Sequence, residues 1–201
     1  MTLIDTLHRH GVFPRRLKVL ARWLSELLPP DAQVLDIGCG DGSLDALIQQ
    51  CRPDVTITGI DVMVRPHTAI PVTAFDGRTI PFADKTFDAA MMVDVLHHTE
   101  NPAILLAEAS RISRQGVVIK DHLRDGLLAN QTLRFMDWVG NAHHGVVLPY
   151  NYWSERQWRS AFTDLGLTTE GWRTELGLYP WPASLLFDRS LHFVTRLTSR
   201  L

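Results

Sequence analysis

The 201-residue sequence predicts an α/β fold, in which a doubly wound, mostly parallel sheet of seven strands carries helices on both faces. Strand-like and helix-like segments alternate between residues 33 and 120, which is typical of parallel strands joined by crossover helices. A glycine-rich turn, DIGCGDG, joins the first of these strands to its helix. Two later strand-like segments, at 167–176 and 191–197, complete the predicted sheet.

The elements up to Lys120 follow from hydrophobic periodicity and from turn residues. Apolar residues recur at helical spacing over 15–28, just before two prolines. Further helices are expected at 43–51, with Ser43 as the N-cap, and at 101–113, where Pro102 stands near the first helical position. Apolar or β-branched runs predict strands at 33–37, 55–60, 70–75, 87–96 and 116–120.

Beyond Lys120 the pattern changes from strict alternation to helices and aromatic loops. An amphipathic helix is expected over 127–140. A second is expected over 154–166, where Ser154 and Gln157 have the spacing of a capping box. The segment that follows the fifth strand therefore predicts an inserted helical lid.

Composition excludes several classes of protein. The formal net charge is −2, so no overall positive field attracts nucleic acid or an anionic membrane. Cys39 and Cys51 make neither a disulfide framework nor a zinc-ligand set, and no run reaches the ~18 apolar residues of a membrane span. The first residues lack the order of a signal peptide. We therefore expect a cytoplasmic monomer or homodimer with no membrane partner, and the charge disfavours a nucleic-acid partner without excluding a local basic patch.

The glycine turn and two acids indicate the kind of ligand. Gly38, Gly40 and Gly42 let the backbone turn sharply at a strand end, where open α/β sheets bind ligands. Their spacing is G-x-G-x-G, not the G-x-G-x-x-G of dinucleotide folds. Asp36 would repel a pyrophosphate but suits a cationic amino group, and Asp61 can accept hydrogen bonds from both ribose hydroxyls. The pattern suits a nucleoside with an amino-acid tail.

At this point the chain resembles the class I S-adenosylmethionine-dependent methyltransferases, in the branch that acts on small molecules. VLDIGCGDG matches the first motif of that family, GIDV its ribose-binding acid, and FDGRTIPFADKTFDAAMMVDVLHHTENP the segment through strands three and four. The resemblance implies a Rossmann-like methyltransferase fold in a single domain, 1–201. Its parts are a helical cap (1–30), a cofactor-binding core (31–120), an acceptor lid (121–153) and the C-terminal part of the sheet (154–201).

The resemblance also implies S-adenosyl-L-methionine as cofactor and assigns ten residues to it. These are Asp36, Gly38 and Gly40 facing the methionine part, Asp61 holding the ribose, Val62 and Met63 lining the adenine, Asp76 and Gly77 at the adenine edge, and Val93 and Asp94 beside the transferred methyl group. Neither a Pro-Cys nucleophile nor an Asn-Pro-Pro-Tyr type motif is present, which favours a small-molecule acceptor.

Three histidines are candidates for acid–base catalysis or acceptor contacts. His97 and His98 follow the fourth strand directly, and His122 follows the fifth. A histidine near its ordinary pKa of ~6.5 is a suitable general base, while packing and helix capping are the alternatives. If the chain is extended here, the side chains of His97 and His98 cannot enter the same pocket. Asp121 and His122, with the pair His143-His144, suit either a metal site or a base with an orienting carboxylate, and no metal is assigned.

Acceptor contacts are expected from the segment after the fifth strand. The candidates are Asp121, His144, Tyr150, Tyr152 and Trp153, the last three as an aromatic wall. Residues His8 to Phe13 are expected to cover the other side of the cofactor. The cluster of Arg15, Arg16 and Lys18 is interpreted as a solvated helix face, and Trp158 as a core residue.

These observations predict methyl transfer from S-adenosylmethionine to a small-molecule acceptor, at a hydroxyl oxygen in preference to nitrogen or carbon. An RNA or protein methyltransferase and a non-catalytic cofactor-binding protein remain open. An NAD-dependent oxidoreductase is disfavoured by Asp36 and by the glycine spacing.

Overall fold

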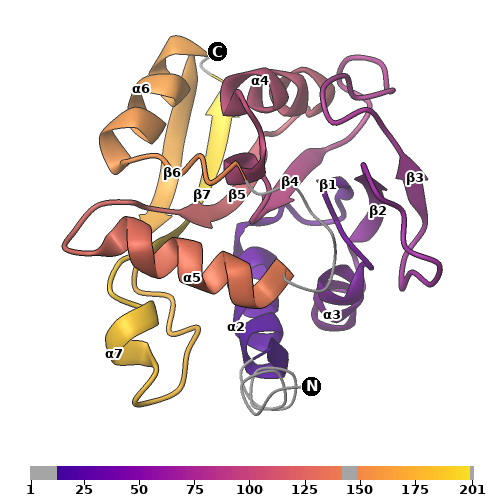
Figure 1. The fold of residues 1–201 in the computed structure, drawn as a ribbon. Coiled ribbons are helices and arrows are strands. Elements are labelled where there is room, and N and C mark those ends of the chain that lie inside the picture. The colour runs from indigo at the N-terminus through magenta and orange to yellow at the C-terminus, as the bar shows by residue number, and fades with distance from the viewer. Residues whose placement is uncertain (1–12, 142–148, 200–201) are drawn as a thin grey trace.

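The computed structural model describes residues 13–141 and 149–199, whose elements are drawn in Figure 1. Seven strands form one sheet in the order β3-β2-β1-β4-β5-β7-β6. They are β1 (Gln33–Ile37), β2 (Thr56–Asp61), β3 (Val72–Ala74), β4 (Ala89–Val93), β5 (Val117–His122), β6 (Leu167–Arg173) and β7 (His192–Ser199). β7 runs antiparallel to both β5 and β6, and the other pairs are parallel. The predicted sheet is confirmed.

Helices cover both faces of the sheet (Figure 1). They are α2 (Phe13–Leu27), α3 (Ser43–Cys51), α4 (Pro102–Ile112), α5 (Ala129–Asn141), α6 (Glu155–Asp164) and the short α7 (Ser184–Phe187), with a 3₁₀ turn η2 (Leu96–His98). One buried apolar cluster joins α2 and α3 to the sheet, and a second joins α4 and α6 to its opposite face. The central strands are buried on both sides, which explains why they read as continuous apolar runs.

The helix ends follow the expected capping rules with one exception. Ser154 and Gln157 form the predicted capping box of α6, and the Asn101 side chain accepts a hydrogen bond at the start of α4. The prediction of Ser43 as the N-cap of α3 was wrong. Gly42 holds that position with a φ of 73°, and Ser43 is the first helical residue. A left-handed glycine can turn the chain into the helix without a side-chain cap.

The strand order changes direction between β1 and β4. From β1 the chain proceeds to β2 and β3 on one side, and later to β5 on the other. Ligands in open α/β sheets bind beside the carboxyl ends of the strands at such a switch point. Among the described helices, none is both long and apolar enough to cross a lipid bilayer.

Candidate active site

A cavity of about 590 Å³ opens at the carboxyl ends of β1, β2 and β4. Eight of the ten residues assigned to the cofactor line it: Gly38, Gly40, Asp61, Val62, Met63, Asp76, Gly77 and Asp94. Asp36 and Val93 lie in the strands below and are not part of this lining. The fold thus brings most of the predicted cofactor residues together around one cavity.

Two glycines of the turn serve different purposes. A Cβ on Gly38 would lie 2.5 Å from a methyl carbon of Val95, so packing within the protein requires glycine there. A Cβ on Gly40 would meet no atom within 4 Å, and its φ is +63°. Gly40 therefore faces open space, where a ligand can approach the backbone closely.

Asp61 connects the glycine turn to the end of β2. Its Oδ2 accepts a hydrogen bond from the Gly40 amide at 2.8 Å, and its Oδ1 accepts one from the Met63 amide at 2.8 Å. Each carboxylate oxygen can accept a further bond, so two ribose hydroxyls still find acceptors. Met63 and Val62 expose large apolar side chains beside this carboxylate, as an adenine ring requires.

Asp76 organises the loop that follows β3. Its Oδ1 accepts hydrogen bonds from the amides of Arg78 and Thr79 at 2.8 and 2.7 Å, and these bonds lower the pKa of Asp76. The second carboxylate oxygen is left for a ligand donor such as an exocyclic amine.

A buried pair of acids lies below the glycine turn, and the sequence analysis found only one of them. Asp36 is 3% exposed, and Asp45 on α3 is fully buried. Burial raises the pKa of both groups, that of Asp45 to about 7, and the neighbouring Asp45 raises the pKa of Asp36 further. Asp45 therefore titrates near neutral pH, and neither of its carboxylate oxygens has a hydrogen-bond partner among the described residues. Asp45 was missed because an acid within a helical pattern is normally solvent-exposed.

The two adjacent histidines lie in η2, and only His98 lines the cavity. The Nδ1 atom of His98 is buried and has no hydrogen-bond partner among the described residues. Burial and the neighbouring His97 lower the pKa of His98 to about 4, so its ring is neutral at physiological pH.

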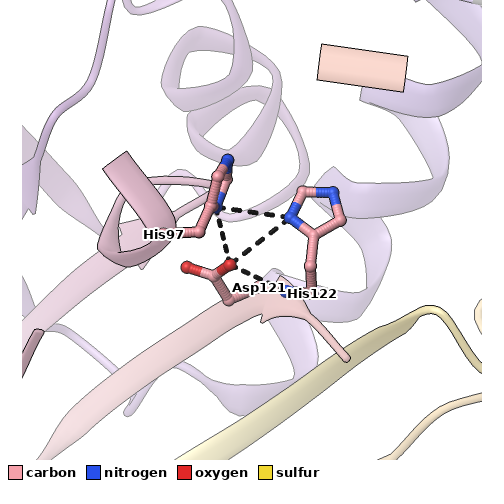
Figure 2. Close-up of side chains that lie close together, drawn as sticks. All are labelled: His97, Asp121 and His122. Carbon is pink, nitrogen blue, oxygen red and sulfur yellow. Dashed lines mark hydrogen bonds and ion pairs between the residues drawn. The ribbon is translucent and has the colours of Figure 1, made fainter. Parts of the chain in front are cut away.

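His97 points into a buried cluster behind the cavity, together with His122 and Asp121 (Figure 2). Its Nδ1 lies 2.7 Å from Asp121 Oδ1, and its Nε2 lies 3.4 Å from Asp137 Oδ2. Although burial disfavours a charged ring, the two carboxylates raise the pKa of His97 to about 10. Burial and the charges of Lys120 and His97 hold the pKa of His122 well below its usual range.

The predicted aromatic wall does not line the 590 Å³ cavity. Tyr152 is buried, donates its hydroxyl to Asp137 and stacks on His97 with ring centres 5.5 Å apart. Trp153 packs against Trp158, which lies in the core as expected. Tyr150 lies under the guanidinium of Arg134 at 4.3 Å. His143, His144 and residues 8–12 lie outside the described part of the chain.

Two basic side chains bind a residue of the cavity lining, a contact that sequence reasoning did not predict. Arg16 and Lys120 both form ion pairs with Asp94, which lines the cavity. These two cations hold the pKa of Asp94 far below its usual range in spite of burial. The interpretation of Arg16 as part of a solvated face was wrong, because α2 packs against the sheet and turns Arg16 toward the strand ends.

Comparisons with known proteins agree with this geometry. A family model described as a methyltransferase domain matches residues 8–170. A malonyl-[acyl-carrier protein] O-methyltransferase from Herminiimonas arsenicoxydans is 35% identical over 106 residues, which cover 49% of this chain and 40% of that protein. The ubiquinone/menaquinone biosynthesis C-methyltransferase UbiE from Desulfotalea psychrophila is 29% identical over 97 residues, 44% of this chain and 39% of that protein. The chain thus spans about two fifths of the length of these curated relatives.

A solved structure matches over the full length of the chain. It comes from the complex between the Haloferax volcanii Trm112 methyltransferase activator and a methyltransferase. The alignment has a TM-score of 0.68 and 16% identity, and covers 100% of this chain and 99% of that chain. At this identity the match shows the fold alone. Because the family model covers more than half of the chain, the chain belongs to the methyltransferase domain family.

Proposed function

We propose that the protein transfers a methyl group from S-adenosyl-L-methionine to a hydroxyl oxygen of a small-molecule acceptor. One observation carries the proposal: a single cavity is lined both by the turn and acids suited to the cofactor and by His98. The small-molecule class follows from the absence of nucleobase-specific motifs and from the low net charge. Relatives named as O-methyl and C-methyl transferases support methyl transfer and leave the acceptor atom to experiment.

The residues present fit this cofactor. Gly40 offers open backbone, Asp61 offers two carboxylate oxygens for the ribose, and Asp76 offers one to the adenine amine. Asp36 and Asp45 below the turn suit a cationic amino group. When bound, the cofactor supplies an electrophilic methyl group on its sulfonium.

The protein's own task is to align the acceptor and to exclude water. His98 is the acceptor contact in this proposal, because its side chain lines the cavity beside the residues assigned to the cofactor. His97 and His122 are buried and do not line the cavity, so this proposal gives the acceptor contact to His98 alone.

We also propose that residues 121–153 contribute the acceptor lid, to which His144, Tyr150 and Trp153 belong, whereas Asp121 and Tyr152 are buried beside His97. The exposed apolar side chains of Phe135 and Trp138 on α5 support this role, since a closing lid buries such groups.

Calorimetry with S-adenosyl-L-methionine and with its demethylated product tests the cofactor assignment. We expect micromolar binding that weakens at least tenfold in Asp61→Ala and is unchanged in Asp164→Ala, an exposed acid on α6. Binding only at millimolar concentration, or equal affinity in both variants, contradicts the proposal.

A screen of small hydroxyl, amine and carbon acceptors with isotopically labelled methyl donor then tests the reaction. NMR of the product distinguishes an O-methyl from an N- or C-methyl group. Methylation of RNA or protein alone, or of nothing in the screen, contradicts the small-molecule assignment. We further expect His98→Gln to lower kcat at least tenfold while the affinity for the cofactor stays the same.

A further inference from the structure

We propose that His97, Asp121 and His122 form a binding site for one divalent transition-metal ion such as Zn²⁺. The site lies behind the cavity, where the carboxyl end of β5 meets the turn η2 (Figure 2). It goes beyond methyl transfer, and its test requires neither cofactor nor acceptor.

The three possible ligand atoms converge from two separate elements. His97 Nδ1 lies 2.7 Å from Asp121 Oδ1 and 3.3 Å from His122 Nδ1, and His122 Nδ1 lies 3.4 Å from the same carboxylate oxygen. In Figure 2 the two Nδ1 atoms and this oxygen face one another. All three side chains are at most 3% exposed. Ligands for a single ion must come together in this way.

The spacing fits a tetrahedral ion. Metal–ligand distances of about 2.0–2.1 Å give edges of about 3.3 Å between tetrahedral ligands. Two of the three observed separations, 3.3 and 3.4 Å, already match, and the third must open from its hydrogen-bonded 2.7 Å. Two imidazoles and one carboxylate favour zinc and similar ions over Mg²⁺ or Ca²⁺, which prefer oxygen ligands.

Surrounding groups hold the ligands as outer contacts of metal sites usually do. The second oxygen of Asp121 accepts a hydrogen bond from the Leu96 amide at 3.0 Å, and the other ring nitrogen of His97 faces Asp137 at 3.4 Å. A histidine that binds a metal commonly presents its second nitrogen to a carboxylate, which fixes the ring and strengthens the ligand. Tyr152 in turn donates to Asp137.

A water molecule is the fourth ligand in this proposal. The nearest further carboxylate oxygen, Asp94 Oδ1, lies 3.6 Å from His122 Nδ1 but is already bound by Lys120. The Nδ1 atoms of His97 and His122 face one another at 3.3 Å, so both can bind one ion once His97 has lost its Nδ1 proton.

Metal titration of the chelator-treated full chain tests the site. We expect one equivalent of Co²⁺ or Zn²⁺ to bind, with the visible bands of four-coordinate Co²⁺. Because the site is buried, the ion is also added during refolding. The affinity should fall at least tenfold in His97→Gln, His122→Gln and Asp121→Asn, and stay unchanged in His67→Gln, an exposed histidine elsewhere. Circular dichroism establishes whether each variant is folded.

A second measurement uses the wild-type chain, so it does not depend on whether the variants fold. X-ray absorption of the Zn²⁺-loaded protein should show at least two imidazole ligands and one oxygen ligand. Absence of stoichiometric binding, fewer than two imidazoles, or unchanged affinity in folded His97 and His122 variants overturns the proposal and leaves a hydrogen-bonded cluster. Cofactor binding is measured separately, so failure of the metal site and failure of the proposed function are distinguishable.

Discussion

Arg16 near the start of α2 forms an ion pair with Asp94 at the end of β4, 78 residues away in the sequence. The pair joins the N-terminal helix to a side chain that lines the cavity. Lys120, on the neighbouring strand β5, binds the other oxygen of the same carboxylate. The ion pair therefore fixes α2 directly to a residue that lines the candidate active site.

Removing Arg16 should destabilise the protein. In Arg16→Gln the partly buried Asp94 loses one of its two cations, and we expect the free energy of unfolding to fall by about 1–3 kcal/mol. Urea denaturation measures this change. Lys18→Gln, an exposed position on the same helix, is the matched control and should stay within about 0.5 kcal/mol of wild type. Equal stabilities for the two variants would show that the ion pair contributes nothing.

The buried acids Asp36 and Asp45 should make stability depend on pH. Their raised pKa values mean that the folded protein binds a proton more tightly than the unfolded chain does. Their contribution is therefore fully present below about pH 4 and is lost as the pH rises through about 7. Asp45→Asn removes one titrating group. Between pH 5 and pH 8 the unfolding free energy of this variant should therefore fall by on the order of 2 kcal/mol less than that of the wild type.

Chemical denaturation at several pH values checks this expectation. Asp164→Asn, which alters an exposed acid, should keep the wild-type profile. Parallel profiles for wild type and Asp45→Asn would mean that Asp45 does not titrate in this range.

The two glycines of the turn should separate stability from ligand binding. Gly38→Ala places a methyl group 2.5 Å from Val95 at a φ of +80°, so we expect a loss of stability of about 2–3 kcal/mol. Gly40→Ala meets no protein atom and should cost only about 1–2 kcal/mol for its left-handed backbone. Its methyl group projects into the space proposed for the cofactor, so cofactor affinity should fall at least tenfold. Thermal denaturation and calorimetry measure the two effects, and equal changes in both variants would be the contrary result.

Cofactor binding should protect the proposed lid from proteolysis. If 121–153 and the segment from His8 to Phe13 close over the ligands, cleavage in both should slow when S-adenosyl-L-methionine or its product is added. Limited digestion with mass spectrometry locates the cut sites. Cleavage in an exposed loop away from the cavity, such as that around Asp54, serves as the internal control. Unchanged rates in both segments would exclude closure driven by the cofactor.

Local patterns predicted the fold well because each central strand contains an apolar run, such as AAMMV in β4 and VVI in β5. The glycine turn and Asp61 were found for the same reason, since their spacing along the chain is short. Contacts between segments that are distant in the sequence leave no local pattern from which they can be predicted. Asp45 looked like an ordinary polar helix residue, and Arg16 looked solvated. Only tertiary packing places one beside Asp36 and the other beside Asp94.

The contacts of the histidine cluster could not be predicted from local patterns either. The pairs His97-His98 and Asp121-His122 drew notice because each follows a strand. The adjacent residues His97 and His98 nevertheless lie in different surroundings. The tight η2 turn places His98 in the cavity lining, while His97 joins the buried cluster with Asp121. No pattern in one segment specifies how a 3₁₀ turn divides two adjacent side chains between a pocket and the interior.

The position of β7 between β5 and β6 constrains how the sheet can form. Among the described strands, β6 pairs with β7 alone. β5 pairs with β4 along one edge and with β7 along the other. Both strands therefore need β7, which is synthesised after them. A nascent chain that ends before His192 presents the edge of β5 as an open template for pairing with other chains. The sheet is therefore complete, and the edge of β5 is protected from aggregation, only after β7 has been synthesised.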